Sequence, residues 1–266
     1  MIGNLITSLG AVSVPFSPTN ISGLKAWYDA SDTSTISLSG SAVTQWNDKS
    51  GNGFNVTQGT SARRPSSGVN TINSKNVLTF GGDDVLQAST ASDWVFLHNA
   101  TGSTVFAVSI HDNTGAAEFP IFATSTGSSQ VGCALRISYD TPPAPFTIGP
   151  FVSTGGGSGT LVSLVSGGAV TAGTAFYVSG IWDNNNATLA NRSLWRQNGG
   201  TQFGGNAQND APVSSNPANP LLIGANNTAG TTGYTGKIAE IIMYTGVLSS
   251  GDVASVNSYL ASKWGI

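Results

Sequence analysis

The chain has 266 residues, a formal net charge of −3 and only 9% charged residues. An electrostatic nucleic-acid binder needs several clustered Lys or Arg residues, and the only adjacent cations are Arg63 and Arg64, so this composition excludes that class. The single cysteine, Cys133, excludes an intrachain disulfide and a cysteine-rich zinc site, and its apolar alternating surroundings predict a buried, inert thiol.

The first 20 residues differ from the rest and end in a proline-interrupted linker, VPFSPTN. Ile2, Leu5, Ile6 and Leu9 recur at i, i+3, i+4 and i+7, the spacing of one apolar helical face. We therefore expect residues 1–20 to form an arm that becomes ordered against a partner subunit or a sister copy. A frayed terminus is the alternative.

This N-terminal segment also bears on the compartment of the protein. It has no Lys or Arg before Lys25 and no long apolar core, so it does not read as a secretory signal. No stretch of the chain approaches the roughly 18 apolar residues of a membrane helix. We therefore expect a protein with no membrane partner.

From Ile21 onward, short apolar runs alternate with turn clusters, and we expect one domain over residues 21–266. Abundant glycine, at 34 residues, disfavours long helices. The Asn198–Gly199 pair is a strong hairpin-turn signal. The runs expected to be strands are NVLTF (76–80), TVFAVSI (104–110), VGCALRISY (131–139), AFYVSGIW (175–182), SLWRQ (193–197), PLLIG (220–224) and KIAEIIMY (237–244). Such a series predicts an all-β sandwich or barrel.

The stretch WNDKSGNG (46–53) places an Asp and a Lys inside a glycine turn. Gly51 and Gly53 can adopt positive φ, and the Asp48 carboxylate can accept hydrogen bonds from the backbone N–H groups that follow it. We therefore expect a structural turn. Contact with calcium or with a sugar is the alternative, and no other cofactor or metal is expected.

One helix is expected at the C-terminus, in SSGDVASVNSYLASKWGI. Ser249 and Asp252 have the spacing of a capping box. Lys263 in the last turn complements the helix dipole. We expect this helix to cover one flank of the sheets through a single apolar face formed by Val253, Val256, Leu260 and Trp264.

Three regions together resemble the LamG-like, concanavalin A-like lectin–glucanase jelly rolls found in bacteriophage virion proteins. The regions are GLKAWYDASDTSTI (23–36) with VTQWNDKSGNG (43–53), VLTFGGDDVL (77–86), and GKIAEIIMYTGVLSSGDVASVNSYLASKWGI (236–266). The resemblance implies a two-sheet antiparallel jelly-roll sandwich with a short C-terminal helix. It also implies a fold that serves in glycan binding and in extracellular or virion surfaces, without settling the function.

Related folds also house glycoside hydrolases, which depend on paired catalytic carboxylates. Retaining hydrolysis needs two carboxyl groups about 5–5.5 Å apart. The chain has two glutamates, Glu118 and Glu240, and neither has a carboxylate within four residues. Asp83 and Asp84 are adjacent, so on a continuous strand they would point to opposite faces. We expect Glu240 to have a hydrogen-bonded structural role and the protein not to be an enzyme.

Glycan binding is the stronger expectation, because sugars stack on aromatic rings and hydrogen-bond to Asn and Asp. Two loops carry both kinds of side chain. The alternative is that Trp182 ends a buried strand and the asparagines only turn the chain. The candidate glycan-binding residues are Trp182, Asp183, Asn184, Asn226 and Tyr234.

These features lead us to expect a non-enzymatic surface protein of a tailed-phage virion: a capsid decoration, head-fibre or tail-associated subunit. Its partners would be capsid or tail proteins and cell-surface or environmental glycans, and we expect a homo-oligomer. A bacterial carbohydrate-binding module is the alternative, and a glycoside hydrolase is third.

Overall fold

The computed structural model describes residues 15–112, 118–127, 129–139, 146–155, 161–164, 166–204 and 210–266. The described part contains one α-helix, α1 (Ser250–Trp264), and short 3-10 helices η1 (Pro18–Asn20), η2 (Thr33–Thr35), η3 (Ser61–Arg63), η4 (Ser92–Leu97) and η5 (Leu189–Asn191). The strands are β1 (Leu24–Asp29), β2 (Ile36–Ser39), β3 (Ala42–Trp46), β4 (Val56–Thr57), β5 (Ser66–Ile72), β6 (Lys75–Gly81), β7 (Leu86–Gln87), β8 (Ser103–His111), β9 (Phe119–Ala123), β10 (Val131–Tyr139), β11 (Phe146–Ile148), β12 (Phe151–Thr154), β13 (Leu161–Leu164), β14 (Gly167–Val170), β15 (Ala175–Trp182), β16 (Ser193–Gln197), β17 (Phe203–Gly204), β18 (Leu222–Ile223) and β19 (Thr235–Thr245).

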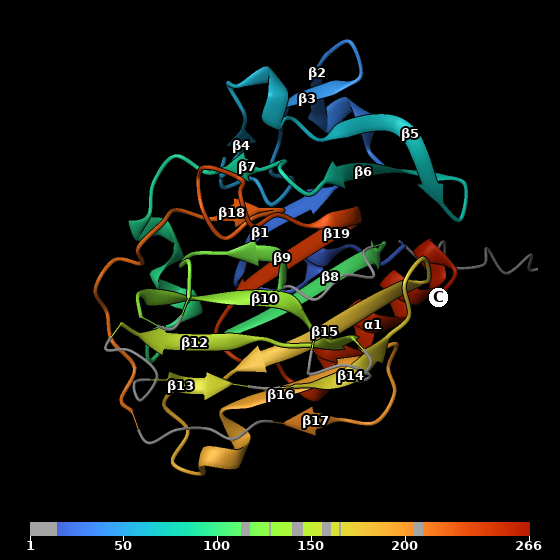
Figure 1. Ribbon diagram of the computed structural model, residues 1–266. Coiled ribbons are helices and arrows are strands. Elements are labelled where there is room, and N and C mark those ends of the chain that lie inside the picture. The colour runs from blue at the N-terminus through green and yellow to red at the C-terminus, as the bar shows by residue number, and fades with distance from the viewer. Residues whose placement is uncertain are drawn as a thin grey trace, which may run out of the picture.

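The strands form two facing layers, and the pairings are antiparallel (Figure 1). In one layer β19 lies between β8 on one side and β1 with β6 on the other, and the layer continues from β8 through β15 and β16 to β17. In the other layer β10 lies between β9 and the pair β11 and β12, and the layer continues from β9 through β18, β7 and β4 to β3.

The two layers are joined where Ala42 of β3 pairs with Ser66 of β5. The pairings therefore connect the strands into one barrel-like sheet. The predicted mostly β, antiparallel fold with a C-terminal helix is confirmed. The predicted division into two separate sheets is not, because the short strands near residues 42–87 continue the hydrogen bonding around one edge.

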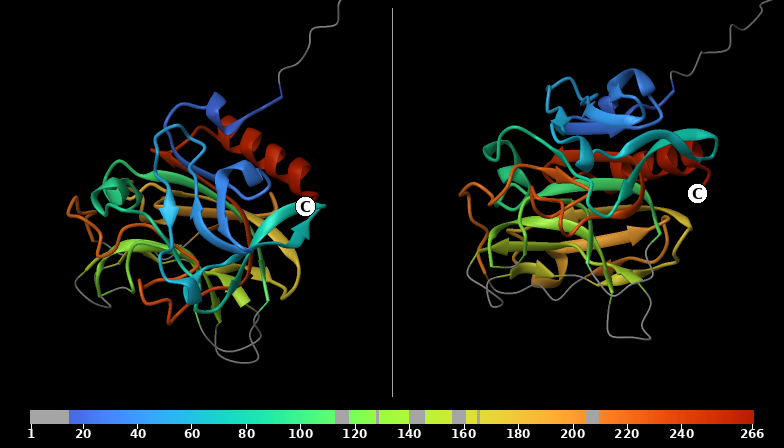
Figure 2. Two further views of the ribbon diagram at one scale, coloured as in Figure 1. Left: turned by 90° about the horizontal axis from the view of Figure 1, so that it is seen from above. Right: turned by 45° about the horizontal axis from the view of Figure 1, so that its top comes forward.

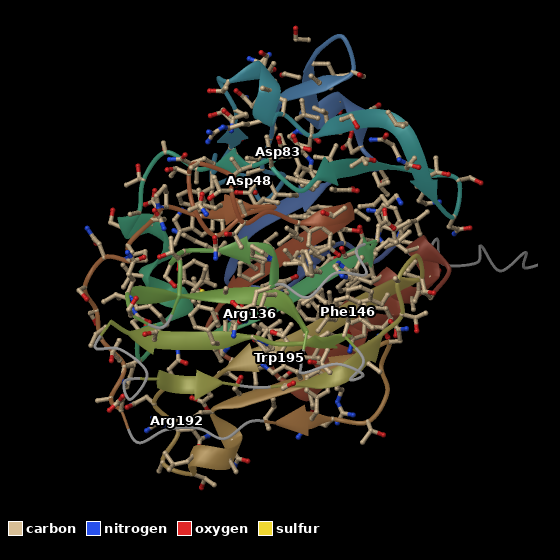
Figure 3. The ribbon with its side chains drawn as sticks, viewed as in Figure 1. Asp48, Asp83, Arg136, Phe146, Arg192 and Trp195 are labelled. Atoms are coloured by element: carbon tan, nitrogen blue, oxygen red, sulfur yellow. The ribbon has the colours of Figure 1, made fainter. Side chains whose placement is uncertain are left out.

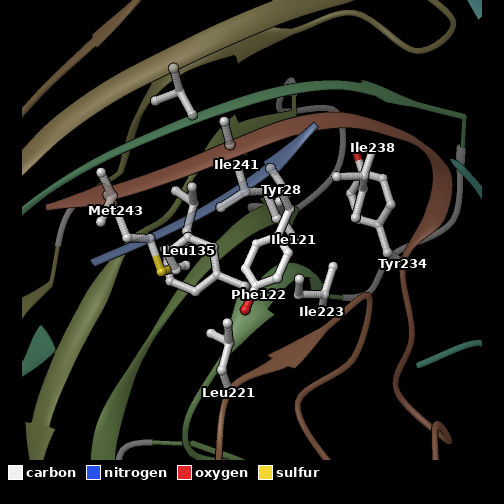
Figure 4. Packing of buried hydrophobic residues seen from close by; sticks show 14 of the residues in the cluster. Tyr28, Ile121, Phe122, Leu135, Leu221, Ile223, Tyr234, Ile238, Ile241 and Met243 are labelled. Atoms are coloured by element: carbon white, nitrogen blue, oxygen red, sulfur yellow. The ribbon is translucent and has the colours of Figure 1, made fainter. Parts of the chain in front are cut away.

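The main core lies between the layers (Figure 4). Leu135 of β10 and Ile121 of β9 face Ile241 and Met243 of β19, and these side chains are buried. Each such side chain contributes roughly 1.5–3 kcal/mol through removal of apolar surface from water. Cys133 belongs to this core, and burial raises the pKa of its thiol to about 12. The predicted burial of this thiol is confirmed.

Helix α1 covers the outer face of the layer that contains β19, β8 and β15, where a second apolar cluster forms (Figure 2). Val256, Leu260 and Trp264 are its buried positions. The Ser249 hydroxyl accepts a hydrogen bond from the Asp252 N–H at 3.1 Å, which caps the first turn. At the other end Gly265 has φ 70°, a left-handed conformation that ends the helix. The predicted helix is confirmed.

The described part of the N-terminal segment also packs on this face. The ring of Phe16 lies 5.8 Å from that of Tyr259 on α1, and the Tyr244 hydroxyl donates to the Pro18 carbonyl at 2.9 Å. Residues 16–20 are therefore attached to the domain that we predicted to begin at Ile21. The predicted docking residues Ile2, Leu5, Ile6 and Leu9 lie outside the described residues.

Within the described ranges no helix combines the length and apolar character needed to cross a bilayer. The predicted hairpin turn after β16 is confirmed, because Asn198 and Gly199 both have positive φ and β16 pairs with β17.

Candidate functional site

The WNDKSGNG stretch forms a turn built around the Asp48 carboxylate (Figure 3). One carboxylate oxygen accepts from the backbone N–H groups of Trp27 at 2.9 Å and Ser50 at 2.8 Å. The other accepts from the Ser50 hydroxyl at 2.7 Å and the Phe54 N–H at 3.1 Å. Gly51 and Gly53 have φ of 91° and 78°. The predicted structural turn is confirmed.

These donors leave the Asp48 oxygens engaged by the protein itself, which disfavours the calcium alternative at this turn. Among the described residues, no group of three or more His, Cys, Asp or Glu side chains is arranged to hold a metal ion. Lys49, the other charged residue of the turn, forms ion pairs with Asp29 at 2.9 Å and Asp32 at 2.8 Å.

Glu240 lies on β19 under helix α1 and is fully buried. Its carboxylate accepts hydrogen bonds from the indole N–H groups of Trp27 and Trp264, both at 2.7 Å, and from the Tyr259 hydroxyl at 2.8 Å. The Lys263 ammonium lies 2.9 Å away. The predicted structural role of Glu240 is confirmed, because every one of these donors belongs to β1 or α1.

Lys263 also pairs with Asp29 of β1 at 2.7 Å. Burial opposes ionisation of Asp29, but the Lys263 ammonium and hydrogen bonds from Lys263, Ser31 and Lys49 outweigh it and lower the Asp29 pKa. For Glu240 the burial is complete and dominates, so its pKa is raised. This buried pair joins α1 to the sheet and is closed to a substrate.

The other carboxylates named from the sequence also make local contacts. Glu118 has a half-exposed side chain and forms an ion pair with Arg136 of β10 at 2.6 Å (Figure 3). Asp84 accepts from the Gly81 N–H at 2.6 Å. Burial, followed by the nearby charge of Asp83, raises the Asp84 pKa despite that hydrogen bond.

The residues predicted to form a glycan platform are mostly inside the protein, which corrects that prediction. Trp182 is 0% exposed, and its ring packs edge-on against Trp195 at 5.1 Å and Phe122 at 6.3 Å. It faces the core because it shares an inward-facing side of β15 with Phe176 and Val178. A buried ring offers no stacking surface.

Asn184 and Tyr234 are buried as well. The Asn184 amide donates to the Asn99 carbonyl at 3.1 Å, and the Tyr234 hydroxyl lies 2.6 Å from the Ser109 hydroxyl. Asp183 and Asn226 are half-buried: Asp183 accepts a hydrogen bond from the Asn186 amide in its own loop, and the Asn226 amide donates to the Thr126 carbonyl. The five residues therefore make hydrogen bonds or ring contacts within the protein and do not form a platform.

A hollow of about 420 Å³ lies instead between α1 and the outer faces of β15 and β16, and we call it the α1 groove. Its volume is that of a small-molecule site. Strand alternation directs Ser179 and Ile181 toward it, and Leu194 and Arg196 line it from β16. The rest of its lining is Gly180, Gly199, Gln202, Leu248, Ser250, Val253, Ala254 and Asn257.

Two polar atoms that line the α1 groove are buried without a hydrogen-bond partner in the described protein, Ser179 Oγ and Asn257 Oδ1. Ser179 is only 2% exposed. Leaving such an atom unpaired costs about 1–3 kcal/mol, so these two atoms are hydrogen-bonding capacity beside the groove that the described protein leaves unused. A serine in the apolar run AFYVSGIW was the sequence signal for this site, and the prediction overlooked it.

Arg196 supplies the groove with donors. Its guanidinium donates to the Gly200 carbonyl at 2.9 Å and the Gln202 side-chain oxygen at 3.3 Å. The aliphatic part of the lining is Ile181, Leu194 and Val253. The groove therefore offers a hydroxyl, an amide and a guanidinium beside an apolar surface.

A second hollow, of about 530 Å³, is lined by Gly81, Gly82, Asp83, Glu118, Phe119, Thr231, Thr232, Gly233 and Thr235. Figure 3 labels Asp83, which marks the position of this hollow. Among the described residues that line this hollow, no side chain has a buried polar atom without a partner. The α1 groove is therefore the better candidate site.

No protein-family model and no curated protein matches the chain. Solved structures share its fold at low identity. Trypanosoma rangeli sialidase in complex with sialic acid aligns over 95% of this chain and 36% of the sialidase, with a TM-score of 0.57 and 13% identity. The chain thus spans about a third of the sialidase.

Domain 4 of AbnA, a GH43 extracellular arabinanase from Geobacillus stearothermophilus, in complex with arabinotriose, aligns over 88% of this chain and 98% of that domain, with a TM-score of 0.56 and 14% identity. An arabinofuranosidase complexed with arabinofuranosyl-alpha-1,2-xylobiose aligns over 84% of this chain and 51% of its own, with a TM-score of 0.57 and 13% identity. These likenesses show a shared antiparallel β fold.

Proposed function

We propose that the chain is a non-enzymatic carbohydrate-binding domain and that the α1 groove holds the sugar. The observation that carries the proposal is the pair of buried, unpartnered polar atoms, Ser179 Oγ and Asn257 Oδ1, in a groove with an aliphatic wall. A sugar hydroxyl both donates and accepts, so it satisfies a serine hydroxyl and an amide oxygen together. The C–H face of the ring would pack on Ile181 and Leu194.

The fold supports the same class. The domain that aligns with this chain over nearly its full length was solved with arabinotriose, and the sialidase and arabinofuranosidase were also solved with sugars. The finer architecture that we propose is the two-sheet, LamG-like jelly roll, with the layers that contain β10 and β19 as its two sheets.

The absence of enzymatic activity rests on how the carboxylates are used. Glu240 and Asp29 are buried and share Lys263, and Glu118 is paired with Arg136. A general acid must reach the glycosidic oxygen, and a nucleophile must reach the sugar ring. The buried pair under α1 reaches neither. A glycoside hydrolase is the competing class.

The experiment is a glycan array probed with the full chain, with reducing-end release measured on every glycan that binds. Ser250→Trp places a large ring at the exposed edge of the α1 groove, and Ser258→Trp makes the same change on α1 outside it. We expect binding without release of reducing ends, loss of binding in Ser250→Trp and retention in Ser258→Trp. An array with no bound glycan, or turnover of a bound one, would overturn the proposal.

We further propose that this domain is displayed on a tailed-phage virion as a capsid decoration, head-fibre or tail-associated subunit. The proposal is supported by the resemblance carried by residues 23–53, 77–86 and 236–266, which supply the Asp48 turn and the Glu240 cluster. Mass spectrometry of purified particles tests it. Detection of the chain in virions supports the proposal, whereas its presence only in a bacterial secretome favours a carbohydrate-binding module.

A further inference from the structure

The α1 groove carries a positive charge, whereas the net charge of the whole chain is negative. The chain has a net charge of −3, yet Arg196 is the one charged side chain among the described residues that line the groove. The N-terminal turn of α1 also borders the groove at Ser250, and the positive end of a helix dipole adds to the local field. Asp252 does not line the groove, and its carboxylate accepts from the Ser249 hydroxyl at 2.8 Å.

Arg196 is held in place without being neutralised. Both of its hydrogen-bond acceptors are uncharged: the Gly200 carbonyl and the Gln202 side-chain oxygen. A guanidinium has five N–H donors in a planar fork, so donors remain for a ligand. That fork matches a carboxylate, which it binds through two parallel hydrogen bonds.

From this geometry we infer that the α1 groove selects acidic sugars, in which a carboxylate on the pyranose ring binds Arg196 while ring hydroxyls pair with Ser179 and Asn257. The inference rests on the proposed function and names the class of its ligand. An inorganic anion would pair with Arg196 but would leave Asn257 Oδ1, an acceptor, without a donor. A uronic or sialic acid residue carries the carboxylate and the hydroxyls together.

The charge of Arg196 accounts for the expected preference for acidic over neutral sugars. A neutral sugar leaves the Arg196 charge facing only uncharged acceptors, whereas a carboxylate forms charge-assisted hydrogen bonds, which are roughly twice as strong as neutral ones. We therefore expect an acidic oligosaccharide to bind at least about tenfold more tightly than the same chain with its carboxylates esterified. The difference should shrink at high salt because the groove is open to solvent.

The probes are trigalacturonate and its fully methyl-esterified form, with matched glucuronate, mannuronate and sialylated oligosaccharides and their esters. Titration calorimetry would use the full chain, Arg196→Gln, and Arg63→Gln as a control, since Arg63 contacts the Thr228 carbonyl and does not line the groove. We expect the preference for acid over ester to be lost in Arg196→Gln and retained in Arg63→Gln, with unchanged melting temperatures.

The outcomes separate the inference from the function on which it rests. Binding of acids and esters with equal affinity, or an acid preference that survives in Arg196→Gln, overturns the inference and leaves carbohydrate binding in place. Binding of neutral array glycans alone also overturns the inference and leaves carbohydrate binding in place. A chain that binds no glycan of either kind overturns both.

Discussion

The Lys263 ammonium, in the last turn of α1, lies 2.9 Å from the buried carboxylate of Glu240 on β19. The same nitrogen reaches Asp29 on β1 at 2.7 Å. Helix α1 is therefore held on the sheet by charge as well as by Val256, Leu260 and Trp264. Removing one partner of a buried pair leaves an uncompensated charge, which is strongly destabilising.

Replacing Glu240 tests this attachment. In Glu240→Gln, the new amide NH₂ faces groups that already donate, including Trp264 and Lys263. We expect the free energy of unfolding to fall by about 2–4 kcal/mol in urea titrations. Glu118→Gln is the control, because that side chain is 49% exposed, and its loss should stay below about 1 kcal/mol. Equal losses in the two variants would contradict the buried-cluster account.

The Asp29 carboxyl should make stability depend on pH. Its pKa is lowered in the folded state, so its contribution is present above the unfolded pKa of about 3.9 and is lost as pH falls through the folded value. The raised Glu240 pKa acts with the opposite sign: its contribution declines as pH rises above about 4.3.

The variant Asp29→Asn removes the first of these effects, and it also relieves part of the second, because the Asp29 charge helps to raise the Glu240 pKa. We expect it to be less stable than the wild type near neutral pH, with the difference shrinking below about pH 4. Urea titrations at a series of pH values measure this, with Asp93→Asn as the control. A difference that stays constant into acid would show that the charge of Asp29 is unimportant.

Backbone strain in the WNDKSGNG turn can be tested by comparing a glycine variant in the turn with a glycine variant outside it. Gly51 has φ 91°, which a β-branched residue rarely adopts, whereas Gly59 does not have a positive φ. A Cβ added at either position would meet no neighbour within 4 Å, so the two variants differ in backbone strain and not in crowding. We expect Gly51→Val to lower the free energy of unfolding by about 1–3 kcal/mol. Gly59→Val should change it little, and a comparable loss at both sites would remove strain as the cause.

The burial of Trp182 predicts a loss of stability and not of binding. We expect Trp182→Ala to cost about 3–5 kcal/mol, because it leaves a cavity beside Trp195 and Phe122. Trp182→Phe should cost less. Glycan affinity, measured on the folded fraction, should be unchanged in both. A stable alanine variant that no longer binds sugar would restore the platform hypothesis.

The docked segment before Ile21 can be tested by truncation. A chain that begins at Pro15 keeps the Phe16–Tyr259 contact and the hydrogen bond from Tyr244 to Pro18, whereas a chain that begins at Ile21 loses both. We expect the shorter chain to be less stable by about 1–2 kcal/mol and the longer one to match the full chain. Identical melting temperatures for both truncations would show that the docked segment adds no stability.

The features predicted well from the sequence are local ones. The α1 signals, from the Ser249 cap to Lys263, all lie within one 15-residue helix and its cap, and Asp48 lies within a few residues of the N–H groups of its turn. A hydrogen-bonded structural role was predicted for Glu240 because no second carboxylate lies within four residues of it, but its partner Trp27 is distant in the chain. For α1 and for the Asp48 turn, the physical cause and the residue that shows it are close together in the chain.

The candidate site could not be predicted in the same way. Trp182 and Ser179 lie on opposite faces of β15, and which face is inward depends on the layer that packs against it. The alternation with Phe176 and Val178 did carry that information for Trp182. The α1 groove also needs Asn257, which lies on a helix distant in sequence from β15 and β16. No local sequence pattern predicts that this helix packs beside those strands.

Carbohydrate binding in the α1 groove would be decided by a crystal structure of the full chain with the tightest-binding oligosaccharide from the array. The account predicts a sugar ring over Ile181 and Leu194, with hydroxyls within hydrogen-bond distance of Ser179 Oγ and Asn257 Oδ1. An oligosaccharide bound in the hollow beside Asp83, with the α1 groove occupied only by solvent, would contradict it.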